Sequence, residues 1–123
     1  MGKQVGKVLE IVAATGKEFE KLPVFVRPMA RRWFKGKSGQ SLENWQRSLS
    51  ALQERLGKGS SEGAQAILPG LDKLIEYYRG VQRETARFMH DQDLLRQAAE
   101  LSDQRIAAIQ QLQAGLRAVI GKG

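Results

Sequence analysis

Apolar residues recur along the chain at the spacing of α-helices. In the first stretch they follow one another in steps of three, four or seven: Val5, Val8, Val12, Phe19 and Leu22. This spacing places the side chains on one stripe of a helix, which we expect to end near Pro23. No segment shows sustained alternation between apolar and polar residues flanked by turn residues, so essentially no β-sheet is expected.

The helical rhythm continues through two prolines. The apolar positions there are Leu22, Phe25, Val26, Met29 and Trp33. Proline interrupts a helix but fits its first turn. We therefore expect a short helix that begins near Pro28, or a kinked continuation of the first helix, before Gly36.

The third expected helix has the most regular pattern. Its apolar seam is spaced 3-4-3-4 and consists of Leu42, Trp45, Leu49, Leu52 and Leu56. Ser41 is placed to cap the start of this helix, and Gly57 is placed to end it. The stretch 57–63 combines glycines and serines with little to bury, which predicts a mobile connection.

Two more helices are predicted in the second half. A short helical turn before Pro69 is expected to lead into a long helix toward His90, with apolar positions at Leu71, Leu74, Ile75, Tyr78, Val81 and Phe88. Gly80 weakens this helix without breaking it. Asp91 is placed to cap a last helix that ends before Gly121. Its seam alternates steps of three and four through Leu95, Ala98, Ser102, Arg105, Ile109, Leu112, Leu116 and Val119.

These elements predict an all-α protein, a helical bundle of about four to five helices with short loops. A length of 123 residues with 41% hydrophobic residues suits one domain over residues 1–123 with one modest core. No run approaches the roughly 18–20 consecutive apolar residues of a membrane span, and the start lacks the long apolar stretch of a secretory signal. The chain has no cysteine, which excludes disulfides, thiolate metal sites and a cysteine nucleophile. We expect a cytoplasmic protein.

The net positive charge comes from the first half of the chain. The formal net charge is +7, and acidic and basic residues balance in residues 60–123. The excess is concentrated in the basic segment, residues 21–37, since no Asp or Glu occurs between Lys21 and Leu42. An uncompensated charge of this kind indicates an anionic partner.

The basic segment is the first candidate for a binding site. Its cations are Arg27, Arg31, Arg32, Lys35 and Lys37, besides Lys21. In a helix, Arg27, Arg31 and Lys35 are four residues apart and share one face, which suits a phosphate backbone. Trp33 or Phe34 would add base stacking if exposed. The alternative is a solvated charged face whose aromatic residues belong to the core.

A second row of cations lies on the predicted long helix. Arg79, Arg83 and Arg87 are spaced four apart. Glu76 and Glu84 each lie three residues before an arginine, so a surface with ion pairs is one interpretation. The other is a second phosphate track, joined to the basic segment if the two helices are neighbours.

The remaining polar clusters give little basis for catalysis or metal binding. His90 lies beside Asp91 and Asp93, and helix capping accounts for both acids. The GKS stretch at Gly36–Ser38 lacks the earlier glycine and the preceding strand of a phosphate-binding loop. We see no triad and no paired carboxylates, and therefore expect no enzyme, no metal site and no cofactor.

Two resemblances bear on function. The stretch KLPVFVRPMARR, residues 21–32, is similar to the opening of a small helical domain at the end of the light-independent protochlorophyllide reductase B subunit, where a proline, a Phe-Val-Arg step and a basic pair recur. WFKGKSG then replaces the acidic and alanine positions expected next, so this resemblance implies no function. In size, charge and helical plan the chain resembles the small helical subunits of multi-subunit CRISPR effector complexes, which implies backbone binding without catalysis.

The sequence thus favours a non-catalytic helical protein that binds RNA or DNA through the phosphates, as a small subunit or accessory factor of a larger complex. One alternative is a membrane-surface protein whose apolar wedge consists of Phe25, Val26, Met29, Trp33 and Phe34. Another is a helical oligomeric adaptor that pairs with itself or a partner through the seams Leu42–Leu56 and Ile109–Val119. In that case the seams should stay partly exposed in the monomer.

Overall fold

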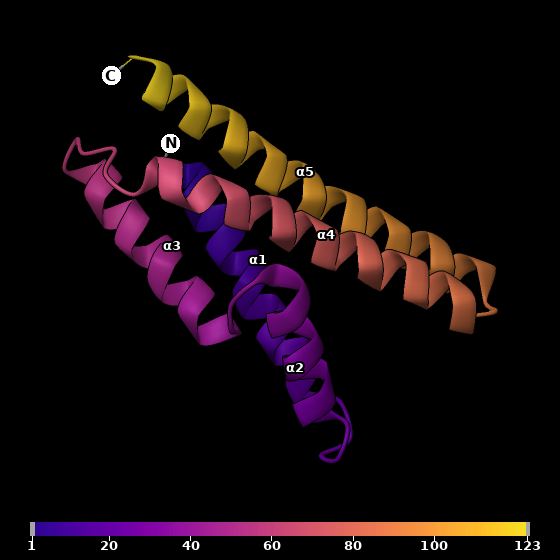
Figure 1. Cartoon of the computed structure of the whole chain (residues 1–123). Helices are drawn as coiled ribbons and strands as arrows, with labels where there is room; N and C mark the ends of the chain where they lie inside the picture. Colours follow the sequence, from indigo (N-terminus) through magenta and orange to yellow (C-terminus); the bar gives the residue numbers. More distant parts are fainter. Residues whose placement is uncertain (1, 123) are drawn as a thin grey trace.

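The computed structural model describes residues 2–122, and these form five α-helices and no strand (Figure 1). The helices are α1 (Gly2–Glu20), α2 (Arg27–Ser38), α3 (Leu42–Gly57), α4 (Ala64–Phe88) and α5 (Gln92–Lys122). The prediction of an all-α bundle with short loops is confirmed. None of the helices within the described range has both the length and the apolar character that a bilayer crossing requires.

The helices pack as a long hairpin with three shorter helices on it. α4 and α5 are joined by a short turn and lie side by side (Figure 1). α1 packs against α3 and α5, while α2 packs mainly against α4 and also contacts α1. The short α2 and the coil that precedes it therefore form one end of the molecule, at the bottom of Figure 1.

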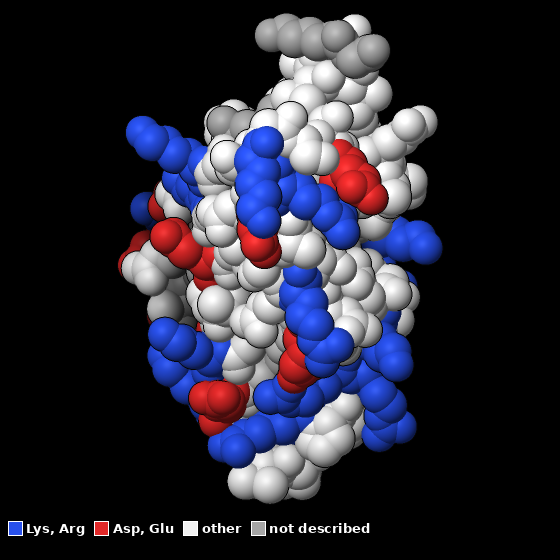
Figure 2. All heavy atoms as spheres, turned by 90° about the vertical axis from the view of Figure 1, so that its left-hand side faces the viewer, with Lys and Arg blue, Asp and Glu red and all other residues white. Residues whose placement is uncertain are grey.

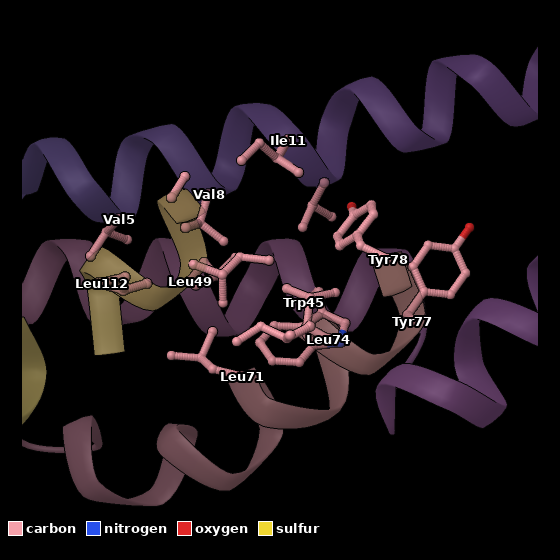
Figure 3. Close-up of a cluster of buried hydrophobic side chains, with 14 of the residues drawn as sticks. Val5, Val8, Ile11, Trp45, Leu49, Leu71, Leu74, Tyr77, Tyr78 and Leu112 are labelled. Carbon is pink, nitrogen blue, oxygen red and sulfur yellow. The ribbon is translucent and has the colours of Figure 1, made fainter. Parts of the chain in front are cut away.

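One apolar cluster joins α1, α3, α4 and α5, and α2 contributes Phe34 to it (Figure 3). It contains the predicted stripe of α1 and the seams of α3 and α5, and its fully buried members include Val5, Val8, Trp45, Leu49, Leu71, Leu74, Ile109, Leu112 and Leu116. Removing these side chains from water is the main favourable contribution to folding. Most of both seams is used within the chain's own core, and only their last members, Leu56 and Val119, stay half-buried.

Two predicted caps are confirmed. The Ser41 hydroxyl accepts a hydrogen bond of 3.2 Å from the Asn44 backbone N–H, and this satisfies a free donor at the start of α3. Asp91 Oδ1 accepts hydrogen bonds from the backbone N–H groups of Asp93 and Leu94, at 2.9 and 3.1 Å. The acids beside His90 therefore act at a helix start, and the described residues contain no cluster of three or more potential metal ligands.

The predicted end of α2 near Gly36 is wrong. The helix continues to Ser38, and Gly39 follows it with φ at 89°, in the left-handed region that favours glycine. The Gly39 N–H bonds to the carbonyl of Lys35. The chain contains two candidate glycines here, and the one in the left-handed conformation is the one that ends the helix.

The helical turn expected before Pro69 is the first turn of α4, which runs without a break from Ala64 through the proline. Pro69 lies near the start of α4 and is exposed, as is Gln65, whose carbonyl loses its partner to the proline ring. Water can satisfy that carbonyl, so the cost is small enough for the helix to continue. At the other end of the chain, α5 extends through Gly121 to Lys122.

Candidate nucleic-acid interface

Arg27, the first residue of α2, holds the chain reversal between α1 and α2. Its Nη2 donates a hydrogen bond of 2.6 Å to the carbonyl of Glu20, and its Nε donates one of 2.9 Å to the carbonyl of Leu22. These carbonyls lie at the end of α1, where helical partners are missing and a cation is favoured. The Arg27 guanidinium therefore already bonds to backbone carbonyls of this chain. Its geometry favours a structural role over the predicted role as a principal phosphate contact.

Arg31 forms an ion pair on the neighbouring helix. Its Nη1 lies 3.1 Å from Oε1 of Glu43, in the first turn of α3, and the two side chains are 43% and 57% exposed. A pair this exposed contributes no more than about 1 kcal/mol, so a phosphate can replace the carboxylate at little cost. Arg31 remains a usable contact, although it is not free in this structure.

Three cations of α2 are exposed and form no ion pair within residues 2–122: Arg32, Lys35 and Lys37. Lys35 and Lys37 lie in the last turn of α2, where the helix dipole favours positive charge. α2 itself carries no acidic residue. We call these three residues the cationic ridge of α2. Their side chains are available for the predicted phosphate contacts.

Arg32 points away from the core. Successive helical residues are rotated by roughly 100°, so Arg32 lies between the flank of Arg31, which faces α3, and the flank of Trp33, which faces α4. In the face shown in Figure 2, to which α3 and α2 contribute, Lys and Arg side chains form a band in the lower half, interrupted by single carboxylates. The cations thus spread around α2 instead of lining one face.

The second row is largely ion-paired. Arg79 Nη1 lies 2.9 Å from Oε1 of Glu76, and Arg87 Nη1 lies 3.5 Å from Oε1 of Glu84. Both pairs are exposed, so the interpretation as a mixed-charge surface describes Arg79 and Arg87. In the described part of the chain, Arg83 has no such pair.

The two rows lie on neighbouring helices, because α2 packs on α4 through aromatic side chains. The rings of Trp33 and Phe34 lie 5.1 and 4.7 Å from that of Tyr77. Arg83 reaches the same contact, with Nη2 3.8 Å from the point where a Cβ on Gly80 would lie. The condition for joining the two rows, that their helices are neighbours, is met.

The same packing excludes the expected base stacking by Trp33 and Phe34. Phe34 is fully buried, and Trp33 is half-buried against α4. The exposed aromatic residues are Phe25 and Phe88, at 79% and 72%. Of these, Phe25 belongs to the apolar wedge of the membrane alternative, while Phe88 was expected on the apolar stripe of the long helix, at an end where exposure depends on how the chain turns.

A polar network inside the bundle was not predicted. The hydroxyls of Tyr78 and Thr15 are 2.7 Å apart, and Arg105 forms two hydrogen bonds with Glu18, of 2.6 and 3.1 Å. Burial lowers the pKa of Arg105, but the hydrogen bond and charge of Glu18 outweigh this and keep it raised. The adjoining cavity of about 100 Å³ is too small for a nucleotide, so we assign the network to stability.

Comparisons of the chain with protein-family models, curated proteins and solved structures give no match.

Proposed function

We propose that the protein is a non-catalytic binder of nucleic-acid phosphates, acting as a small subunit or accessory factor of a larger nucleoprotein complex. The observation that carries this proposal is the cationic ridge of α2: three exposed cations on a helix without acids, next to Arg31 and to the arginines of α4. Each cation that neutralises a phosphate releases condensed counterions, which favours binding at low salt.

The contacts differ in strength. Arg32, Lys35 and Lys37 contact phosphates directly, while Arg31, Arg79 and Arg87 exchange weak carboxylate partners for phosphates, and Arg83 adds charge between the two rows. With Phe34 in the core and Trp33 packed against α4, recognition rests on the backbone and is independent of sequence. Action in the cytoplasm belongs to the same proposal and is supported by the lack of cysteine.

The test measures binding of labelled RNA and DNA, single- and double-stranded, by fluorescence anisotropy over a series of salt concentrations. The triple variant Arg32→Gln, Lys35→Gln, Lys37→Gln should lower affinity at low salt by about tenfold or more. It should also reduce the slope of log K against log salt by up to about 0.9 per lost contact on duplex DNA.

The matched control removes the same charge from α1, through Lys3→Gln, Lys7→Gln and Lys17→Gln, three exposed cations away from the ridge. This control should retain most of the affinity. The proposal fails if the wild-type protein binds no nucleic acid at low salt, or if the control weakens binding as much as the ridge variant does, because net charge alone would then explain the attraction.

A further inference from the structure

The connection between α1 and α2 carries an exposed apolar tip. Val24 is 72% exposed, Phe25 is 79% exposed, and Met29, one turn into α2, is 62% exposed. These are three of the most exposed large apolar side chains in the described residues. The coil that holds them lies at the bottom end of the molecule in Figure 1, and the lower end of Figure 2 is correspondingly white below a border of cations.

The tip is a defined turn. The Val26 N–H bonds to the carbonyl of Pro23 at 2.9 Å, which puts Val24 and Phe25 at the two central positions. Such positions normally hold polar or small residues. Pro23 fixes one end, and the two hydrogen bonds of Arg27 hold the other. Apolar side chains presented on so constrained a turn are already in position for a partner and lose little entropy on binding.

The chemistry around the tip favours a lipid surface. Lys21 and Arg32 are exposed on either side of it along the chain, and no acid occurs between Glu20 and Glu43. The apolar surface continues past the half-buried Val26 into an open groove that Phe88 also lines; the acids Glu84 and Asp91 line this groove too, so the cationic border of the tip is on the α2 side. A projecting apolar tip with flanking cations matches a bilayer interface, where acyl chains lie beneath anionic phosphates.

We propose that this tip docks the protein on membranes that contain anionic lipid. Val24 and Phe25 enter the boundary between head groups and acyl chains, Met29 lies at the surface, and Lys21 and Arg32 contact lipid phosphates. This proposal does not depend on the nucleic-acid proposal, since the apolar residues of the tip have no role in phosphate binding. It replaces the wedge expected from the sequence, because Phe34 is in the core and Trp33 packs against α4.

The experiment is co-sedimentation of the full chain with vesicles of phosphatidylcholine alone or mixed with phosphatidylglycerol. Binding is expected only with the mixed vesicles. The double variant Val24→Ser, Phe25→Ser should lower the partition coefficient by about tenfold or more. It should leave the circular dichroism spectrum and the nucleic-acid affinity unchanged. Leu101→Ser, which alters an apolar side chain of α5 that is 44% exposed, should bind vesicles like the wild type.

A second measurement does not depend on loss of binding. In Phe25→Trp, the introduced indole should be quenched by brominated lipid in mixed vesicles. The proposal is overturned if the wild type does not bind mixed vesicles, or if the double variant binds them equally well, since attraction would then be purely electrostatic. It is also overturned if the double variant loses nucleic-acid binding, or if it abolishes a self-association of the wild type seen by ultracentrifugation without lipid.

Discussion

Trp33 lies against Gly80, and this contact seats α2 on α4. A Cβ at position 80 would lie 3.3 Å from Cζ2 and 3.4 Å from Cη2 of the indole. Gly80 is buried in the middle of a long helix, where glycine is otherwise unfavourable, by about 1 kcal/mol relative to alanine. The absence of a side chain there is what allows the basic helix to approach.

Replacing Gly80 with Leu should therefore destabilise the protein. The larger side chain displaces Trp33, and overpacking of this kind costs about 1–3 kcal/mol in the free energy of unfolding, measured by urea denaturation. Gly36→Leu is the matched control, because a Cβ at Gly36 meets nothing within 4 Å. The control should leave stability unchanged or raise it slightly. Equal effects of the two variants would contradict the role given to Gly80.

Arg27 and Arg32 should respond differently to truncation. Arg27→Ala removes both hydrogen bonds, and because water reaches the exposed carbonyl of Glu20, the free energy of unfolding should fall by about 0.5–1.5 kcal/mol. Arg32→Ala removes an exposed side chain and should change it by less than about 0.5 kcal/mol. Denaturation curves of the two variants distinguish these outcomes. A loss of nucleic-acid binding in Arg27→Ala is therefore interpretable only alongside its stability.

The positions of the helices could be read from the sequence because burial imposes the period of the helix. The seam of α3 is buried from Leu42 to Leu52, as its 3-4 spacing predicts, and Ser41 and Asp91 cap the helices they precede. Gly36, where the end of α2 was expected, weakens the helix without ending it, and Pro69 is tolerated near the start of α4. Whether a helix continues through such a residue depends on whether water can reach the free backbone groups and on the conformation of the residues that follow.

The sequence does not reveal in the same way which groups the cationic side chains bond to. The run of positive charge is visible in the sequence, but the partners of Arg27 are backbone carbonyls brought near by a chain reversal, and Glu43 meets Arg31 only because α3 turns back on α2. Likewise, Phe25 and Trp33 belong to the same apolar pattern in the sequence, although their exposure differs in the structure. The turn at Pro23 exposes the first, and Gly80 accommodates the second.

Ser38 illustrates a polar residue with a buried role. In the sequence it belongs to a polar turn, yet it is fully buried, and its hydroxyl accepts a 3.2 Å hydrogen bond from the indole N–H of Trp45. Ser38→Ala would leave that N–H without a partner in the core, which should cost about 1–3 kcal/mol of stability by chemical denaturation. Ser50→Ala, on the exposed side of α3, should have almost no effect. A silent Ser38→Ala would show that water replaces the hydroxyl.

Stability should fall as the pH rises above 10. Burial raises the pKa of Tyr78 from 10.0 to about 12, against the opposing effects of the Thr15 hydrogen bond and the Arg105 charge. Burial also raises the pKa of Tyr77, and the charge of its neighbour Tyr78 adds to this. While Tyr78 is neutral, Thr15 donates its single proton to the carbonyl of Ile11 and accepts from the Tyr78 hydroxyl. On ionisation the Thr15 hydroxyl can turn and donate to the phenolate, and for this reason the contact lowers the pKa.

The sign follows from proton binding. Between pH 10 and 12 the unfolded chain releases tyrosine protons that the folded chain retains, so the free energy of unfolding decreases with pH. The stability that Tyr78 contributes is fully present below pH 10 and is lost as the pH rises through about 12, at about 1.4 kcal/mol per unit of pKa difference. The total for Tyr78 is on the order of 2–3 kcal/mol.

The measurement is urea denaturation at a series of alkaline pH values, with tyrosinate absorbance followed in parallel. The chain has two tyrosines, so the absorbance reports on Tyr77 and Tyr78 alone. In Tyr78→Phe the decrease between pH 10 and 12 should be about half as steep, because folded Tyr77 still retains its proton there. The variant also loses its hydrogen bond to Thr15 at every pH. Tyrosine ionisation near pH 10 in the folded wild type, or a decrease that persists unchanged in Tyr78→Phe, would show that another group causes the alkaline unfolding.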